Sequence, residues 1–221
     1  MKKIVYAILA IVMVACNQSP EKKVNALIQE SVKKSLYHPE SYEAVETIID
    51  SAFAPKDDPA FYEKTLKIYH YAKDLQECTE EIQQAERSMN IWHSSYMSEY
   101  ARAEYNHAKQ KHDDYILKEE KLKNKIRKAY EELWKIAETG RQFIGFKATH
   151  KFRAKNNAGN TLMGENVYIM NEDLTKILAS YDADSEEYFA VQALYQSWAE
   201  ELEEALEEWQ KIYEEAKAME E

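Results

Sequence analysis

Few side chains in this sequence could do chemistry, and the most suggestive group is one carboxylate and imidazole pair. Glu104-Tyr105-Asn106-His107 has the Glu-x-x-His spacing that places both groups on one helical face in di-metal bundle proteins. Such a centre needs two of these motifs, and the sequence contains one. Because residues 112–114 beside it are also polar, we expect a solvated surface and no metal site there.

Other motifs that carry chemistry are missing. The sequence has no P-loop, no Rossmann glycine pattern, no G-x-S-x-G elbow and no H-E-x-x-H pair. Cys78 falls on the apolar seam of a predicted helix, where a buried small side chain is a commoner explanation than a redox thiol. We therefore predict a noncatalytic protein without a cofactor.

The beginning of the chain has the pattern of a bacterial export signal. Lys2 and Lys3 precede an apolar run over residues 4–14, which is too short to span a bilayer. Met13-Val14-Ala15-Cys16 resembles the bacterial lipobox, although leucine is commoner than Met13 at its position. The resemblance implies that residues 1–15 are removed and that Cys16 receives the lipid. Ordinary secretory cleavage is the alternative.

A lipidated Cys16 would make the membrane the first partner of the protein. Two or more acyl chains anchor a protein stably, whereas one does not. Asn17 stands where an aspartate would resemble the usual signal for inner-membrane retention. We therefore expect a cell-envelope lipoprotein of the outer membrane, facing either the periplasm or the cell surface.

The charge of the predicted mature chain excludes one class of partner. Without Lys2 and Lys3, 27 basic residues remain against 40 acidic ones, a formal charge of −13. Nucleic acid is therefore not expected to bind. After Cys16 the only cysteine is Cys78, so an intramolecular disulfide framework is excluded and stability must come from packing.

Hydrophobic periodicity predicts a mostly helical α+β protein with a small antiparallel sheet. Residues 16–59 are predicted to form a tether, a first helix from Pro20 to about Tyr37, and a first strand over 44–50. Residues 140–183 are predicted to complete the module with one long strand and two return strands, over 167–170 and 177–181.

Residues 60–139 are predicted to be an inserted, coiled-coil-like helical hairpin. One seam follows Leu75, Cys78, Ile82, Ala85, Met89, Trp92 and Tyr96, and the other follows Leu122, Ile126, Ala129, Leu133 and Ile136. The polar segment 106–114 is the predicted tip, which would place Leu75 near Ile136. One straight helix remains the alternative, because neither glycine nor proline marks a turn.

Residues 184–221 are predicted to form an acidic amphipathic helix. Asp184 and Glu187 resemble a capping box, and an apolar heptad pattern runs from Tyr195 to Met219. The segment contains 13 acidic residues and two lysines, a net charge of −11. This helix could pack on the predicted hairpin or bind an envelope protein partner, since the same pattern serves both uses.

Two short segments carry a further resemblance. Pro39-Glu40-Ser41-Tyr42-Glu43 and the segment HKFRAKNNAG, residues 150–159, resemble the P-x-S-Y and R-A-K-N-x-x-G elements of small uncharacterised bacterial lipoproteins and periplasmic proteins. The resemblance covers about residues 24–50 and 143–181 and implies a small sheet module of unknown function.

The residue types within these two motifs favour a structural role. Ser41 can cap a turn, Tyr42 can cover the edge of a core, and Asn156 with Gly159 suits positive φ. The alternative is a small-ligand or glycan site on the sheet that would use Tyr42, His150, Arg153 and Asn156.

Overall fold

The computed structural model describes residues 19–93 and 98–198, which divide between two compact units. One unit contains the chain up to Pro59 together with Thr139–Phe189, and the other contains Ala60–Glu138 and the chain from Ala190 onward. The fold is α+β and mostly helical with a four-stranded antiparallel sheet, which confirms the predicted fold class.

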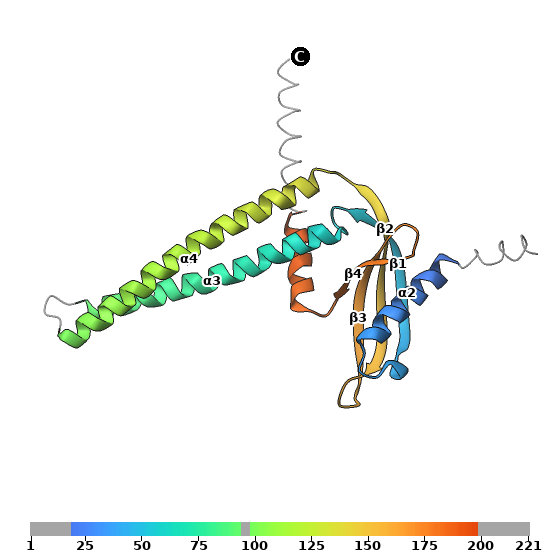
Figure 1. The fold of residues 1–221 in the computed structure, drawn as a ribbon, viewed down its shortest axis with the longest axis horizontal. Helices are drawn as coiled ribbons and strands as arrows, with labels where there is room; N and C mark the ends of the chain where they lie inside the picture. Colours follow the sequence, from blue (N-terminus) through green and yellow to red (C-terminus); the bar gives the residue numbers. More distant parts are fainter. Residues whose placement is uncertain (1–18, 94–97, 199–221) are drawn as a thin grey trace, which may run out of the picture. The chain divides into compact units, whose positions relative to one another are not determined.

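The first unit is a sheet covered by one helix (Figure 1). Helix α2 (Pro20–Ser35) and the short helix η1 (Pro39–Ser41) precede strand β1 (Glu43–Ala54). Strands β2 (Gln142–Lys155), β3 (Thr161–Met170) and β4 (Ile177–Asp182) follow much later in the chain. The strand order is β1-β2-β3-β4, with each neighbouring pair antiparallel.

The core of this unit lies between α2 and one face of the sheet. Val24, Ile28 and Val32 recur every four residues on α2 and are at most 1% exposed. They pack against buried sheet residues and a loop residue, namely Ala148, Tyr168, Met170 and Leu174. Helix α2 starts at Pro20 as predicted and ends slightly early, where the Ser35 hydroxyl donates to the carbonyl of Val32.

The strands are longer than predicted, because polar and small residues extend each apolar run. β1 reaches Ala54, whose side chain is buried together with that of Ala52. A register shift lies between Ala52 and Phe53, opposite Gly145. Gly145 has φ of +134°, and a Cβ there would meet the carbonyl oxygen of Met170 at 2.0 Å, so only glycine fits this position.

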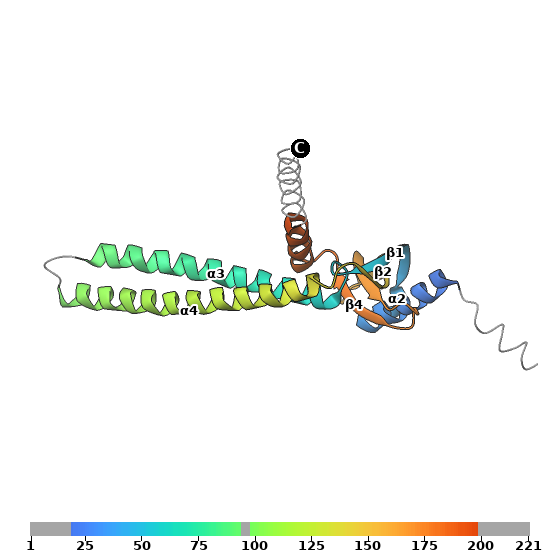
Figure 2. The same cartoon turned by 90° about the horizontal axis from the view of Figure 1, so that it is seen from above.

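The second unit contains the hairpin of α3 (Pro59–Trp92) and α4 (Glu99–Ala137), which run side by side in both Figure 1 and Figure 2. Lys64 pairs with Glu132, and the ammonium of Lys125 lies 5.4 Å from the ring centre of Tyr71. The two apolar seams face inward, with Cys78, Ile82 and Ala85 buried on α3 and Leu122, Ala129 and Leu133 buried on α4. The hairpin is confirmed, and the single straight helix is excluded.

The predicted position of the hairpin tip is wrong. Residues 106–114 lie within α4, while α3 ends at Trp92 and the Ser98 hydroxyl caps α4 by accepting from the amide of Ala101. The polar segment stays helical because Ala108 faces inward and is 4% exposed. The predicted tip would have placed Leu75 near Ile136. The contact between Tyr71 and Lys125 shows a different alignment of the two helices, in which Leu75 does not face Ile136.

The last described helix covers residues 186–198 and begins two residues later than predicted. Ser185 caps it by accepting from the amide of Tyr188, whereas Asp184 belongs to the preceding turn, where its amide donates to Asp182. The predicted capping box at Asp184 is therefore wrong. Ser185 stands directly before the first helical residue, where serine is among the favoured capping residues.

The described start of the acidic helix packs on the hairpin. Tyr195 and Trp198 contact the ring of Phe61 at centroid distances of 5.3 and 6.3 Å, and Trp198 also contacts Tyr130 at 6.0 Å. The rest of the predicted helix, like the predicted signal and Cys16, lies outside the described residues. Within the residues that are described, no helix is long and apolar enough to cross a membrane.

Candidate functional site

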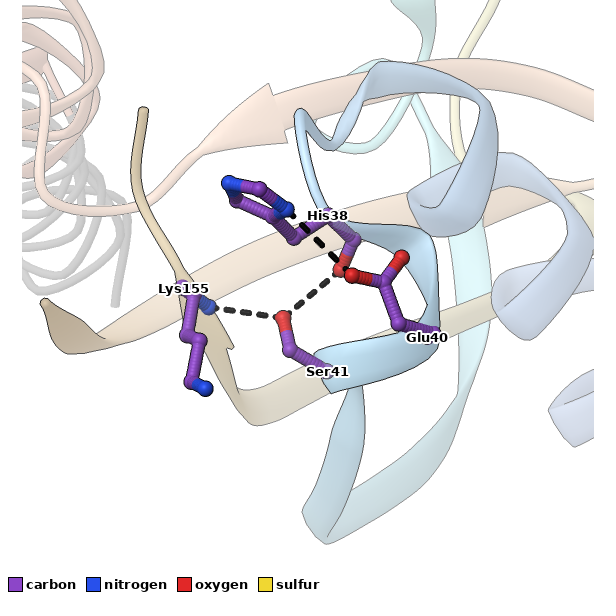
Figure 3. A network of polar contacts seen from close by, with 4 residues as sticks. All are labelled: His38, Glu40, Ser41 and Lys155. Carbon is purple, nitrogen blue, oxygen red and sulfur yellow. Dashed lines mark hydrogen bonds and ion pairs between the residues drawn. The ribbon is translucent and has the colours of Figure 1, made fainter. Parts of the chain in front are cut away.

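The two motifs singled out in the sequence meet at one end of the sheet. The Ser41 hydroxyl on η1 donates to the carbonyl of His38 at 2.6 Å and accepts from the backbone N–H of Lys155 at 2.8 Å (Figure 3). Nδ1 of His38 lies 3.3 Å from the carboxylate of Glu40. Ser41 therefore fastens the P-E-S-Y segment to the last residue of β2.

A second link joins the same two motifs deeper in the unit. The Tyr42 hydroxyl lies 2.9 Å from Nε2 of His150, and the Thr47 hydroxyl lies 2.9 Å from Nδ1 of the same ring. His150 is 1% exposed, so both of its nitrogens find partners inside the protein. A neutral imidazole donates from one nitrogen and accepts at the other, and hydroxyl groups can satisfy either tautomer.

Aromatic and polar side chains surround this histidine. The ring of Phe152 stacks on His150 with centroids 5.8 Å apart and an interplanar angle of 11°. Tyr42 contacts both rings at 6.0 Å. The ammonium of Lys33 on α2 lies 5.7 Å from the centre of the Tyr42 ring. Helix α2, η1, β1 and β2 thus all contribute to one cluster.

Burial dominates the electrostatics of the cluster. Desolvation lowers the pKa of His150 below its usual 6.5, opposed by a hydrogen bond to the backbone of Glu46. Desolvation and the nearby Tyr168 raise the pKa of Tyr42, and desolvation likewise raises the pKa of Tyr168. These directions favour a neutral histidine and neutral phenols, which hold the elements together by hydrogen bonding.

The other two candidate residues lie elsewhere. Arg153 is exposed, with its Nε 3.3 Å from the sulfur of Met163. The Asn156 side chain is used by the β2–β3 turn, where its oxygen accepts from the amides of Ala158 and Asn160 at 3.0 Å each. Gly159 has φ of +81°, as predicted, whereas the prediction of a positive φ at Asn156 is wrong, since Leu174 is the one described non-glycine residue with a positive φ. The structure therefore brings Tyr42 and His150 together and leaves Arg153 and Asn156 apart from them.

Sequence reasoning missed Thr47, Phe152 and Lys33 as members of the cluster. Thr47 lies in the predicted first strand, and a strand through His150 and Phe152 places both on one face, but neither pattern indicates what covers that face. A histidine on the apolar face of a predicted strand is a usable signal, because its nitrogens then require polar partners nearby.

The hairpin has a surface depression of a different character. A groove of about 400 Å³ is lined by Glu77, Glu80, Glu81, Arg87, Tyr115 and Lys118, among others. Its lining is mostly charged, unlike the apolar pockets that enclose small ligands. Across residues 19–93 and 98–198, no group of three or more His, Cys, Asp or Glu side chains is placed to hold a metal ion.

Comparison with known proteins identifies no relative of this chain. No family model, no curated protein and no solved structure matches this chain. The resemblance to bacterial lipoprotein modules therefore stands on the two motifs alone, and the contacts of Ser41, Tyr42 and His150 give those motifs a structural explanation.

Proposed function

We propose that the protein is a lipid-anchored cell-envelope protein, held in the outer membrane through Cys16, that acts as a noncatalytic interaction or scaffolding protein. Its sheet unit would be the part nearest the anchor along the chain, and its helices would engage an envelope partner. The lipobox-like segment and the long paired helices support this proposal.

The observation that carries the proposal is the apolar character of the described ends of α3 and α4. Ile91 is 74% exposed and Tyr100 is 64% exposed, although the seams behind them are buried. Trp92 contacts Tyr100 with an edge-to-face geometry at 5.6 Å. Large aromatic and aliphatic side chains grouped on a surface are typical of protein interaction sites.

The anchor has its own test. Cells grown with an alkyne-bearing fatty acid should incorporate the label into this protein, and the Cys16→Ala variant should not. Label incorporation that persists in Cys16→Ala would contradict lipidation at this residue. Fractionation of the labelled protein would then show which membrane holds it.

The interaction is tested by chemical cross-linking in the native envelope, followed by purification and mass spectrometry. We expect a reproducible partner that is lost from the Ile91→Ser/Tyr100→Ser variant and retained by Leu117→Ser, which alters a 55% exposed residue on α4. Equal cross-linking by all three proteins would overturn the proposed role of the hairpin end.

A truncation tests the acidic helix as a second partner-binding element. It must end after Trp198, because Tyr195 and Trp198 pack on Phe61 and an earlier end would strip the hairpin of those contacts. Loss of a partner from this truncation would assign that partner to residues 199–221.

The alternative, a small-ligand or glycan site on the sheet, has less support. His150 is buried with both nitrogens engaged, and Arg153 and Asn156 do not join it. Arg153→Ala should therefore leave any glycan binding unchanged, whereas a loss of binding would revive this alternative.

A further inference from the structure

Strand β1 presents a long edge that is blocked only near its end, where Asp57 binds both the N–H and the C=O of Phe53. It spans 12 residues, and among the described strands only β2 pairs with it. An edge strand turns unpaired N–H and C=O groups outward, and proteins commonly protect such edges with charged side chains, above all lysine, with proline or with β-bulges. Residues 43–54 contain no lysine and no proline, and their register shifts lie near the two ends of the strand. Register shifts limit the regular part of the edge to the stretch between Glu46 and Ala52.

The exposed face of this stretch has an acidic and aliphatic pattern. Thr47 and Ile49 point toward α2, since one bonds His150 and the other packs against the core. Glu46, Ile48 and Asp50 therefore share the opposite face. Ile48 is 50% exposed, and Glu46 and Asp50 are also exposed.

The neighbouring strand shows which chemistry complements this row. On β2, Lys151, Thr149 and Lys147 stand opposite Glu46, Ile48 and Asp50 respectively. Nζ of Lys151 lies 3.6 Å from the Glu46 carboxylate, whereas Nζ of Lys147 lies 2.9 Å from the carboxylate of Asp57. Opposite charges directly across a ladder stabilise strand pairing. The outer side of β1 offers the same row to an incoming strand.

We propose that the free edge of β1 binds an extended segment of a partner protein that carries lysine or arginine at alternate positions. The backbone of that segment would add a strand to the sheet, and its basic side chains would pair with Glu46 and Asp50. A second copy of this chain fits less well. Antiparallel pairing of two β1 strands about Ile48 would set Glu46 of one copy opposite Asp50 of the other, and like charges there repel.

A peptide copied from β2 is a suitable probe. Residues 147–155, KATHKFRAK, carry all of their basic side chains at alternate positions and already match β1 in the fold. Binding to the full chain in mild detergent would be measured by peptide fluorescence anisotropy, and hydrogen exchange would report the amides of β1. Two control peptides are needed. One carries Lys147→Glu and Lys151→Glu, and the other is N-methylated at alternate residues, which removes the backbone N–H donors that would face β1.

We expect the basic peptide to bind, to slow exchange of β1 amides, and to lose about tenfold or more in affinity in each control form. Ile48→Lys should weaken binding by a similar factor because it places a cation between the two acids. Leu178→Lys, at a 42% exposed position on the other edge strand, is the matched control and should bind normally.

Three results would overturn the proposal. Equal binding of the N-methylated peptide would show attraction without strand addition. Equal binding to Ile48→Lys and the wild-type chain would place the peptide elsewhere. Dimerisation that slows exchange of β1 amides, and that Ile48→Lys abolishes, would identify a second copy as the occupant. None of these results bears on the hairpin end, so the proposed function would be judged separately.

Discussion

The Tyr42 hydroxyl lies 2.9 Å from Nε2 of His150, although the two residues are 108 positions apart in the chain. The bond joins the end of η1 to the middle of the sheet. Tyr42→Phe removes it and leaves a ring nitrogen of a buried histidine without this partner. We expect a loss of about 1 to 2 kcal/mol in the free energy of unfolding.

Hydrogen exchange of β2 and β3 amides is the appropriate measurement for Tyr42→Phe, because Trp92, Trp134 and Trp198 all lie in the hairpin unit and fluorescence would report that unit. Protection of α3 and α4 amides provides an internal reference. Unchanged protection throughout the sheet would show that the Tyr42–His150 bond contributes nothing to stability.

Acidification should weaken the sheet unit through His150. Burial lowers the folded-state pKa of this residue below 6.5, so between the two pKa values the unfolded chain binds more protons than the folded one. Stability should therefore fall as the pH drops below about 6.5 and level off below the folded pKa. Urea unfolding followed by hydrogen exchange at a series of pH values would measure this slope.

The matched comparison for the pH series is His150→Gln against the wild-type chain. His150→Gln lowers stability at every pH but should flatten the slope, because glutamine does not titrate in this range. The series should stop at about pH 5, above the range in which carboxylates titrate. A slope that survives in His150→Gln would assign the acid sensitivity to another group.

Ser41→Ala should loosen the end of β2. The substitution removes the acceptor for the Lys155 amide and the donor to the His38 carbonyl. Because water replaces these two hydrogen bonds only in part, we expect the free energy of unfolding to fall by about 1 kcal/mol. The Lys155 amide should exchange faster by NMR. Ser180→Ala on exposed β4 is the control, and equal effects of the two variants would argue against a specific tie at Ser41.

The hairpin seam predicts a contrast between two isoleucines of α3. Ile82 is 8% exposed and Ile91 is 74% exposed. Ile82→Ala should destabilise the hairpin by about 2 to 4 kcal/mol, because it leaves a cavity between the helices. Ile91→Ala should change the stability by less than about 0.5 kcal/mol. Tryptophan fluorescence during urea unfolding would compare them, and equal midpoints would contradict the seam.

The predictable parts of this fold are those fixed by local periodicity. The spacing of Val24, Ile28 and Val32 was enough to place α2, and the alternation around Ala148 was enough to place β2. The hairpin tip was misplaced because polar composition does not distinguish a turn from a solvated helical face. The cap comes instead from Ser98, which lies outside the polar segment 106–114 on which the predicted tip was based.

The candidate site was predictable as a pair of motifs but not as a cluster. Residue types suggested that Ser41 caps a turn and that Tyr42 covers a core edge, and both now have partners on β2. What no local pattern could supply is the register of β1 on β2, which places Thr47 opposite His150. Arg153 and Asn156 were grouped with them only because they are close in sequence.

The pairing of Ala54 with Gln142 gives the hairpin a further property. These residues are paired on neighbouring strands. The chain therefore leaves the sheet before α3 and returns to it after α4 at adjacent points. The sheet itself is a plain meander whose first connection happens to be long. Whole heptads could therefore be added to or removed from both helices without disturbing the strands, so the length of the hairpin is free to vary independently of the sheet.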